Sequence, residues 1–163
     1  MRASLEAHLG SRQVARVVYG SIIGLALVVA IEAHPPKTGV VVGWVFGTAI
    51  AVALAEIYSE VIGLETRERH PVTRPQLMHM VDDGAAVAFG VAFPDVWFLL
   101  AAFGVIELHT AFTIAKWSGL ALIGCYGYWA ARLSGAPVPR ALVRGGIVAL
   151  VGGALIALKA VLH

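Results

Sequence analysis

The sequence GWVFGTAIAVALAEIYSEVIG, residues 43–63, is an apolar stretch of membrane length that ends with two carboxylates, Glu56 and Glu60. About 20 apolar residues suffice for a helix to cross a bilayer. A small residue stands at every fourth position, which places these residues in one row along a helix. The row, called the 43–63 row below, consists of Gly43, Gly47, Ala51, Ala55, Ser59 and Gly63. Such rows allow neighbouring helices to approach closely in membranes, so we expect a helix contact beside the two carboxylates.

The composition of the whole chain predicts a membrane protein. Of its 163 residues, 59% are hydrophobic and 13% are charged, whereas a soluble domain carries about a quarter charged residues. A net charge of +2 with scattered arginines argues against nucleic-acid binding. No nucleophile motif, phosphate loop, zinc signature or dinucleotide fingerprint is present, so we expect neither an enzyme nor a bound cofactor. The single cysteine, Cys125, lies in an apolar stretch and is predicted to be a core residue.

Five apolar stretches predict an all-α membrane protein made of a single five-span domain. Prolines and polar turns separate the stretches, and Pro94-Asp95 interrupts the third. The predicted spans are 14–32, 38–58, 82–106, 114–132 and 141–162, with a cytoplasmic connection over 59–81. The helix of the second span is expected to continue past the membrane through Glu60 to Arg69, before Pro71 and Pro75 break it.

The basic residues predict the orientation of these spans. The nine arginines fall in the N-terminal segment and in the second and fourth connections, whereas the three lysines fall on the opposite side. Because cytoplasmic segments carry the excess of basic residues, we expect a cytoplasmic N-terminus and an outside C-terminus. The composition fits a bacterial cytoplasmic membrane.

A second row of small residues lies in the predicted fifth span. This 141–157 row consists of Ala141, Gly145, Ala149, Gly153 and Ala157. Two such rows predict a compact bundle. An odd number of spans cannot divide into equal halves, so we hypothesise a homodimer with a site at its two-fold axis.

Three carboxylates lead the candidate transport path. Glu56 and Glu60 stand at the cytoplasmic end of the second span, where an ionisable side chain indicates function unless it is simply solvated among the headgroups. Asp95 follows Pro94 in the third span, where a broken helix frees backbone carbonyls. Its alternative is a loop position. Tyr19 and Ser21 of the first span are expected to line the same cytoplasmic half.

Several other polar residues are weaker candidates. The 59–81 connection carries a mixed set of oxygen, nitrogen and sulfur donors that suits ferrous iron or manganese, although a solvated linker is the alternative. This set consists of Glu65, Glu68, His70, Met78, His79 and Met80. Asp82 and Asp83 are predicted to cap the third span. Glu32 is expected to be hydrated, and Lys116 to reach the interface beside Trp117.

The chain resembles the vacuolar iron transporter family in several short motifs. The best match is ALIGCYGYWAARLSGAPVPRALVRGGIVALVGGALIAL, whose Arg-Leu-Ser-Gly turn joins two glycine-containing spans. Phe89-Gly90 followed by Pro94 resembles part of the family's third span, and Ala55-Glu56 with Tyr58-Ser59 resembles the end of its second.

The resemblance implies a dimeric five-span protein that exchanges ferrous iron or manganese for protons, with Glu56 in the transport path. Two features depart from the family. Ile23 stands where the family's first span carries an aspartate, and the 59–81 connection replaces a long acidic domain.

Two classes of function follow. The first is an integral membrane transporter of divalent metal in exchange for protons, with metal at Glu56 and Glu60. The alternative is a scaffold or accessory subunit that keeps the bundle without an ion path, which Ile23 favours. A small dimeric ion channel is a third possibility.

Overall fold

The computed structural model describes the backbone of residues 2–162 and the side chains of residues 13–154, 156 and 157. This part of the chain forms six α-helices and no β-strand, which confirms the predicted all-α class. The helices are α1 (Arg2–Glu32), α2 (Thr38–Glu68), α3 (Arg74–Ala92), α4 (Asp95–Ala102), α5 (Leu108–Leu133) and α6 (Val138–Leu162).

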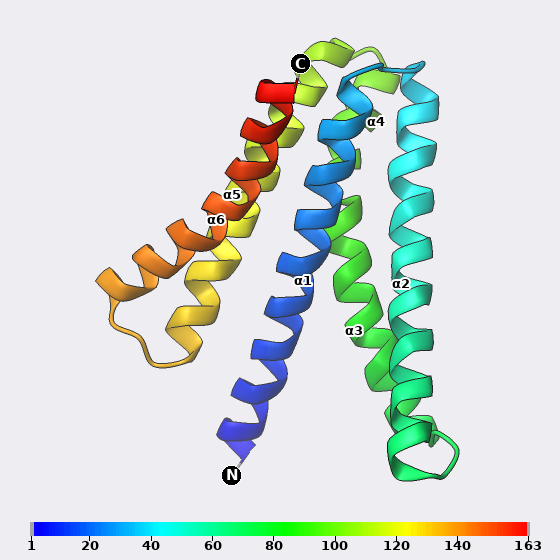
Figure 1. The fold of residues 1–163 in the computed structure, drawn as a ribbon, viewed down its shortest axis with the longest axis vertical. Helices are drawn as coiled ribbons and strands as arrows, with labels where there is room; N and C mark the ends of the chain where they lie inside the picture. Colours follow the sequence, from blue (N-terminus) through cyan, green and yellow to red (C-terminus); the bar gives the residue numbers. More distant parts are fainter. Residues whose placement is uncertain (1, 163) are drawn as a thin grey trace.

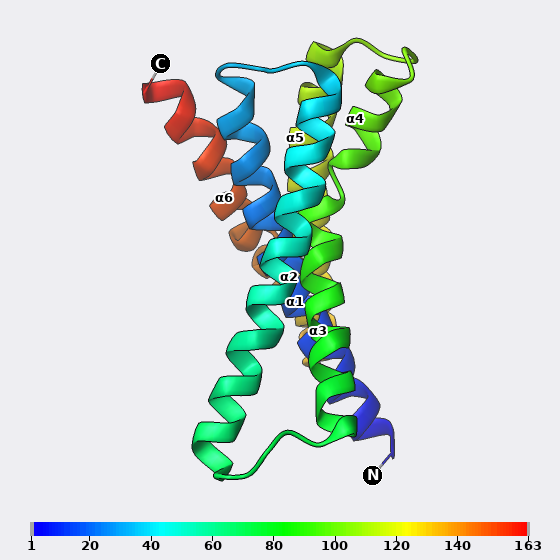
Figure 2. The ribbon, with the colours of Figure 1, turned by 90° about the vertical axis from the view of Figure 1, so that its right-hand side faces the viewer.

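The helices run up and down along one axis. Figures 1 and 2 show that α3 and α4 follow each other along a single path, and that α1, α2, this α3–α4 path, α5 and α6 alternate in direction. The chain begins at one end of the bundle, together with the 69–73 and 134–137 connections, and finishes at the other. We call these the N-terminal and C-terminal ends of the bundle.

Within the described part of the chain, two helical segments are long and apolar enough to cross a membrane. They are Gln13–Glu32, which contains an 18-residue window with a mean hydropathy of 2.2, and Thr38–Glu68, which contains one with a mean hydropathy of 2.1. The pair α3 and α4 becomes a third if it counts as one span bent by 51° at residues 93–94. The chain therefore has the character of a membrane protein.

The 59–81 connection is largely helical. The expected continuation of the second helix to Arg69 is confirmed, whereas the start of the third helix at Arg74, and not at Asp82, corrects the sequence prediction. Helix α2 continues to Glu68 and ends at Arg69, whose φ of 57° is left-handed. Helix α3 then starts at Arg74, and Gln76 Oε1 accepts a hydrogen bond from the Thr73 N–H at 2.9 Å. Only residues 69–73 lie outside the two helices, because the capping contacts complete both helix ends.

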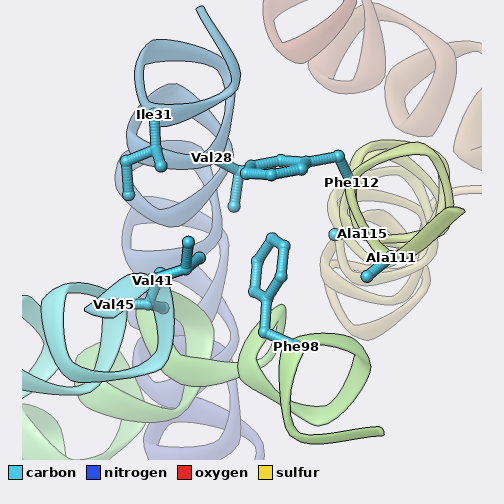
Figure 3. Close-up of a cluster of buried hydrophobic side chains, with 8 residues drawn as sticks. All are labelled: Val28, Ile31, Val41, Val45, Phe98, Ala111, Phe112 and Ala115. Atoms are coloured by element: carbon cyan, nitrogen blue, oxygen red, sulfur yellow. The ribbon is translucent and has the colours of Figure 1, made fainter. Parts of the chain in front are cut away.

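The main apolar core lies toward the C-terminal end of the bundle. In Figure 3, Phe98 of α4 and Phe112 of α5 point toward each other, and their rings meet edge to face at 4.9 Å. The cluster draws on four helices: Val28, Ile31, Val41, Val45, Phe98, Ala111, Phe112 and Ala115. Apolar packing thus joins α1, α2, α4 and α5 at this end.

Glycines bring α1 and α3 into backbone contact. A Cβ added at Gly24 would lie 2.7 Å from the Val91 carbonyl oxygen, and one at Gly90 would lie 2.6 Å from the Ser21 nitrogen. Gly20 similarly faces the Val87 backbone. The spacing of Gly20 and Gly24 is a glycine-based packing motif of membrane helices, and only glycine allows so close an approach.

The two predicted rows of small residues behave differently. The 141–157 row packs on α5 in its first part, since Ala141 and Gly145 are buried and a Cβ at Gly145 would lie 2.8 Å from the Gly124 carbonyl oxygen. Its second part does not, because a Cβ at Gly153 would meet no atom within 4 Å and Ala157 is exposed. The 43–63 row does not pack in this way: all six of its residues are exposed, and no neighbouring atom lies within 4 Å of a Cβ built at Gly43, Gly47 or Gly63. Helix α2 instead buries Val41, Val45 and Ala49. No helix in the described part of the chain therefore packs along the 43–63 row.

Candidate functional site

An arginine surrounded by carboxylates lies at the N-terminal end of the bundle. Arg16 of α1 forms ion pairs with Glu56 through Nη1 and with Glu60 through Nη2. Its Nη2 also lies 3.8 Å from Asp83 Oδ2 of α3. We call these four residues the arginine cluster. It brings together the two predicted carboxylates of α2 and adds one acid and one base that were not predicted as site residues.

The helical geometry explains why these side chains meet. Glu56 and Glu60 are one turn apart on α2 and face the same neighbours. Next to Asp83, Gly84 leaves room for α2, since a Cβ there would lie 2.8 Å from Ile57 Cγ1. The side chains are mostly withdrawn from solvent: Arg16 is 24% exposed, Glu56 18% and Asp83 10%. Partial desolvation makes such pairs stronger than ion pairs on an open surface.

A polar pocket of about 520 Å³ adjoins the arginine cluster. Glu60 and Asp83 belong to both, and Asp82, His79 and Met80 line other parts of its wall. Asp82 and Asp83 lie two turns inside α3 and do not cap a helix, because α3 begins eight residues earlier than predicted. Arg67 also lines the pocket, so three carboxylates, Glu60, Asp82 and Asp83, share its wall with one base and leave an excess of acidic groups that attracts cations.

The predicted mixed donor set is not gathered at one point. His70 Nε2 lies 3.0 Å from Glu68 Oε2, and Glu65 Oε1 accepts a hydrogen bond from the Val72 N–H at 3.3 Å. Both contacts lie at the 69–73 turn. On α3, Met78 is 70% exposed whereas Met80 is buried. The described residues contain no group of three or more His, Cys, Asp or Glu side chains placed to hold a metal ion.

The two polar residues predicted in the first span are placed apart. Ser21 is buried, and its Oγ donates a hydrogen bond to the Val17 carbonyl oxygen of the same helix at 2.7 Å. Tyr19 is 49% exposed.

Asp95 is the most deeply buried carboxylate of the candidate path. It is the first residue of α4, directly after Pro94, and 5% of its surface is exposed. Neither carboxylate oxygen has a hydrogen-bond partner within the described part of the chain. The interruption predicted at Pro94-Asp95 is present, as the bend between α3 and α4.

Three interpretations of isolated residues are corrected. At the C-terminal end, Lys116 Nζ donates to both carboxylate oxygens of Glu32, at 2.6 and 2.9 Å. Glu32 is thus not simply hydrated, and Lys116 is not a free interface anchor. Cys125 is exposed, whereas the sequence predicted a core position.

The position of Arg16 in the sequence is a signal for the arginine cluster. Arg16 is one of the arginines that indicate the cytoplasmic side, yet it also lies inside the predicted first span of residues 14–32. An arginine within an apolar span needs a carboxylate partner. Glu56 and Glu60, predicted at the same membrane face, were the candidates.

Comparisons of the chain with models of protein families, with curated proteins and with solved structures gave no match.

Proposed function

We propose that this protein is an integral membrane transporter of cations, and that the pocket beside the arginine cluster receives the cation. The observation that carries the proposal is the convergence of Glu56, Glu60 and Asp83 on Arg16, directly beside an open pocket that Glu60 and Asp83 also line. Carboxylates rarely occur in membrane-length helices unless they serve an ion path or an internal pair.

In this proposal Arg16 acts as a tethered cation. Its guanidinium binds the carboxylates of Glu56 and Glu60 when the pocket is empty, and an entering cation competes with it for their oxygens. We propose a divalent metal ion, ferrous iron or manganese, in exchange for protons. The resemblance to iron transporters supports this cargo, as do His79 and Met80 beside the acidic oxygens.

We further propose the five-span topology, with α5 and α6 as the fourth and fifth spans and the N-terminal end in the cytoplasm. The segments at that end carry all nine arginines, including Arg69, Arg74 and Arg140, whereas those at the other end carry Lys37. This asymmetry supports the orientation. The cytoplasmic membrane of a bacterium is the proposed location.

The 43–63 row supports a homodimer. It is a ridge of small residues on α2, and only 17% of the apolar window of that helix is buried within the chain. A second copy of α2 can approach such a ridge closely. We therefore propose that α2 pairs with α2 of a second copy.

Metal uptake into proteoliposomes tests the transporter. Ferrous iron, manganese and zinc are each offered across an imposed pH gradient. We expect saturable, pH-dependent uptake in the wild type, reduced at least tenfold in Glu56→Gln because the cation then loses a charged ligand. Glu107→Gln serves as the control, since Glu107 is exposed near the C-terminal end. Undiminished uptake by a folded Glu56→Gln protein would reject the role of Glu56.

The arginine cluster also favours a second candidate, a non-transporting scaffold. Arg16 already pairs with Glu56 and Glu60, which is the arrangement expected of a purely structural contact between α1 and α2. Absence of uptake for every metal by a folded wild-type protein would favour this candidate. Flux that rises linearly with concentration would instead indicate an ion channel.

A further inference from the structure

Asp95 lies at the one helix break within a candidate span. Its carboxylate is 95% withdrawn from solvent and makes no hydrogen bond with any described residue. An ionised carboxylate in such a position is costly unless a cation or several donors compensate it. The break must therefore supply a compensating group, or the carboxyl must be neutral.

The backbone around Asp95 supplies acceptors. Pro94 has no N–H, so the Gly90 carbonyl loses its usual helical partner. The Val96 N–H donates a hydrogen bond to the Phe93 carbonyl at 3.4 Å, and the Trp97 N–H donates one to the Pro94 carbonyl at 3.1 Å, each three residues back in the chain. The helical ladder is thus interrupted at the break, and a carboxylate placed there adds two more acceptors.

The neighbouring α1 packs directly against these carbonyls. A Cβ at Gly24 would lie 2.7 Å from the Val91 carbonyl oxygen and 3.2 Å from that of Gly90. Because Gly24 has no side chain, this close contact supplies no side-chain donor to the two carbonyls. Oxygen acceptors are therefore concentrated where the span is broken, and a donor is the group that is missing.

No described charged side chain provides that donor. Helix α4 packs against α2 and α5, and α2 carries no ionisable residue between Thr38 and Ala55. On α5, Lys116 is bound to Glu32 and His109 is exposed. On α3 and α1, Asp83 and Arg16 belong to the arginine cluster. The dipole at the start of the eight-residue α4 favours an anion, but too weakly to replace a partner.

We propose that Asp95 is a protonation site, whose carboxyl holds a proton while the helix break is closed and gives it to water when the break opens. Proton release leaves the carboxylate and a hydronium ion, and the reverse step restores the neutral acid before the break closes. A proton neutralises this buried carboxylate by itself, whereas a metal ion would need further ligands that no described side chain provides beside Asp95. The site lies about 18 Å along the α3–α4 path from Asp83, since twelve residues of helix separate them, so it is distinct from the pocket.

The protonation site does not depend on the proposed transport function, although its use as the coupling site does. Infrared spectroscopy of the protein in liposomes at pH 7 tests the site directly. We expect a carbonyl band of a protonated carboxylic acid, which shifts in D₂O as the proton exchanges. Asp95→Asn should abolish this band, whereas Asp82→Asn, which changes an exposed carboxylate, should leave it unchanged.

The melting temperature of each variant shows whether the variant is folded. Asn imitates the neutral acid in size and polarity, so the Asp95→Asn protein should melt within a few degrees of the wild type. Asp95→Glu, which keeps the acid, should retain a protonated band if the asparagine variant fails to fold. Absence of the band in the folded wild type, persistence of the band in Asp95→Asn, or a band that never shifts in D₂O would overturn the proposal.

Transport measurements separate the two proposals. If the protein transports metal, Asp95→Asn should uncouple uptake from the pH gradient. A protonated band together with no metal uptake would uphold the protonation site and reject the transporter. Uptake that stays fully coupled to the gradient in Asp95→Asn would remove Asp95 from the coupling mechanism.

Discussion

At the scale of single residues, Arg16 shows how one guanidinium can join three helices. It contacts carboxylates from α2 and α3 while standing on α1, with its own side chain 24% exposed. Arginine suits this role because its planar group presents several donors in fixed directions. Removing one partner leaves the remaining charges poorly compensated in a partly dry environment.

A double-mutant cycle measures this coupling. Arg16→Gln and Glu56→Gln should each lower the free energy of unfolding by about 1–3 kcal/mol, between the values for exposed and buried pairs. The double variant should lose less than the sum of the two single losses. Reversible unfolding in mixed detergent micelles provides the measurement, with Glu107→Gln as the control. Strictly additive losses would show that the two side chains do not interact.

At the scale of helices, small residues serve two purposes in this protein. Between α1 and α3, glycines allow direct backbone contact at Gly24 and Gly90. Between α5 and α6, Gly145 allows the approach of Gly124. Along α2, however, the 43–63 row faces outward. The same sequence pattern therefore marks both internal contacts and a surface available to a second copy.

A matched pair of glycine substitutions distinguishes the two purposes. Gly24→Ala should lower the melting temperature, with a loss of about 1–3 kcal/mol, because its Cβ meets the backbone of α3. Gly47→Ile should leave the melting temperature unchanged, since no atom lies within 4 Å of its Cβ, but should weaken self-association in detergent. Sedimentation equilibrium reports the association. Unaltered association in Gly47→Ile would contradict pairing through α2.

At the scale of the whole molecule, the chain concentrates apolar packing and polar groups at opposite ends. The Phe98–Phe112 contact and its surrounding core lie toward the C-terminal end, whereas the arginine cluster and the polar pocket lie at the N-terminal end. The proposed orientation exposes the polar end to the cytoplasm. The Glu32–Lys116 pair then joins α1 to α5 near the outer face.

Cysteine labelling tests the number of spans and their orientation together. In a Cys125→Ala background, a membrane-impermeant thiol reagent applied to intact cells should label His34→Cys and not Ser134→Cys. Both positions are exposed in connections between helices, at opposite ends of the bundle. Labelling of both variants would indicate that α5 does not cross the membrane, and labelling of Ser134→Cys alone would invert the topology.

The sequence by itself determined the helical class, the break at Pro94-Asp95 and the turn at residues 134–137, because proline chemistry and hydropathy act locally. It also placed Glu56 and Glu60 on one helical face. The end of the second helix near Arg69 was also predicted, because Pro71 follows it. The start of α3 was not, since the capping contacts of Thr73 begin the helix at Arg74 and not at Asp82. Only the tertiary structure decided which faces meet. It paired Arg16 with the α2 carboxylates, buried Asp95 without a partner and left the 43–63 row exposed, because these outcomes depend on the rotation and approach of whole helices.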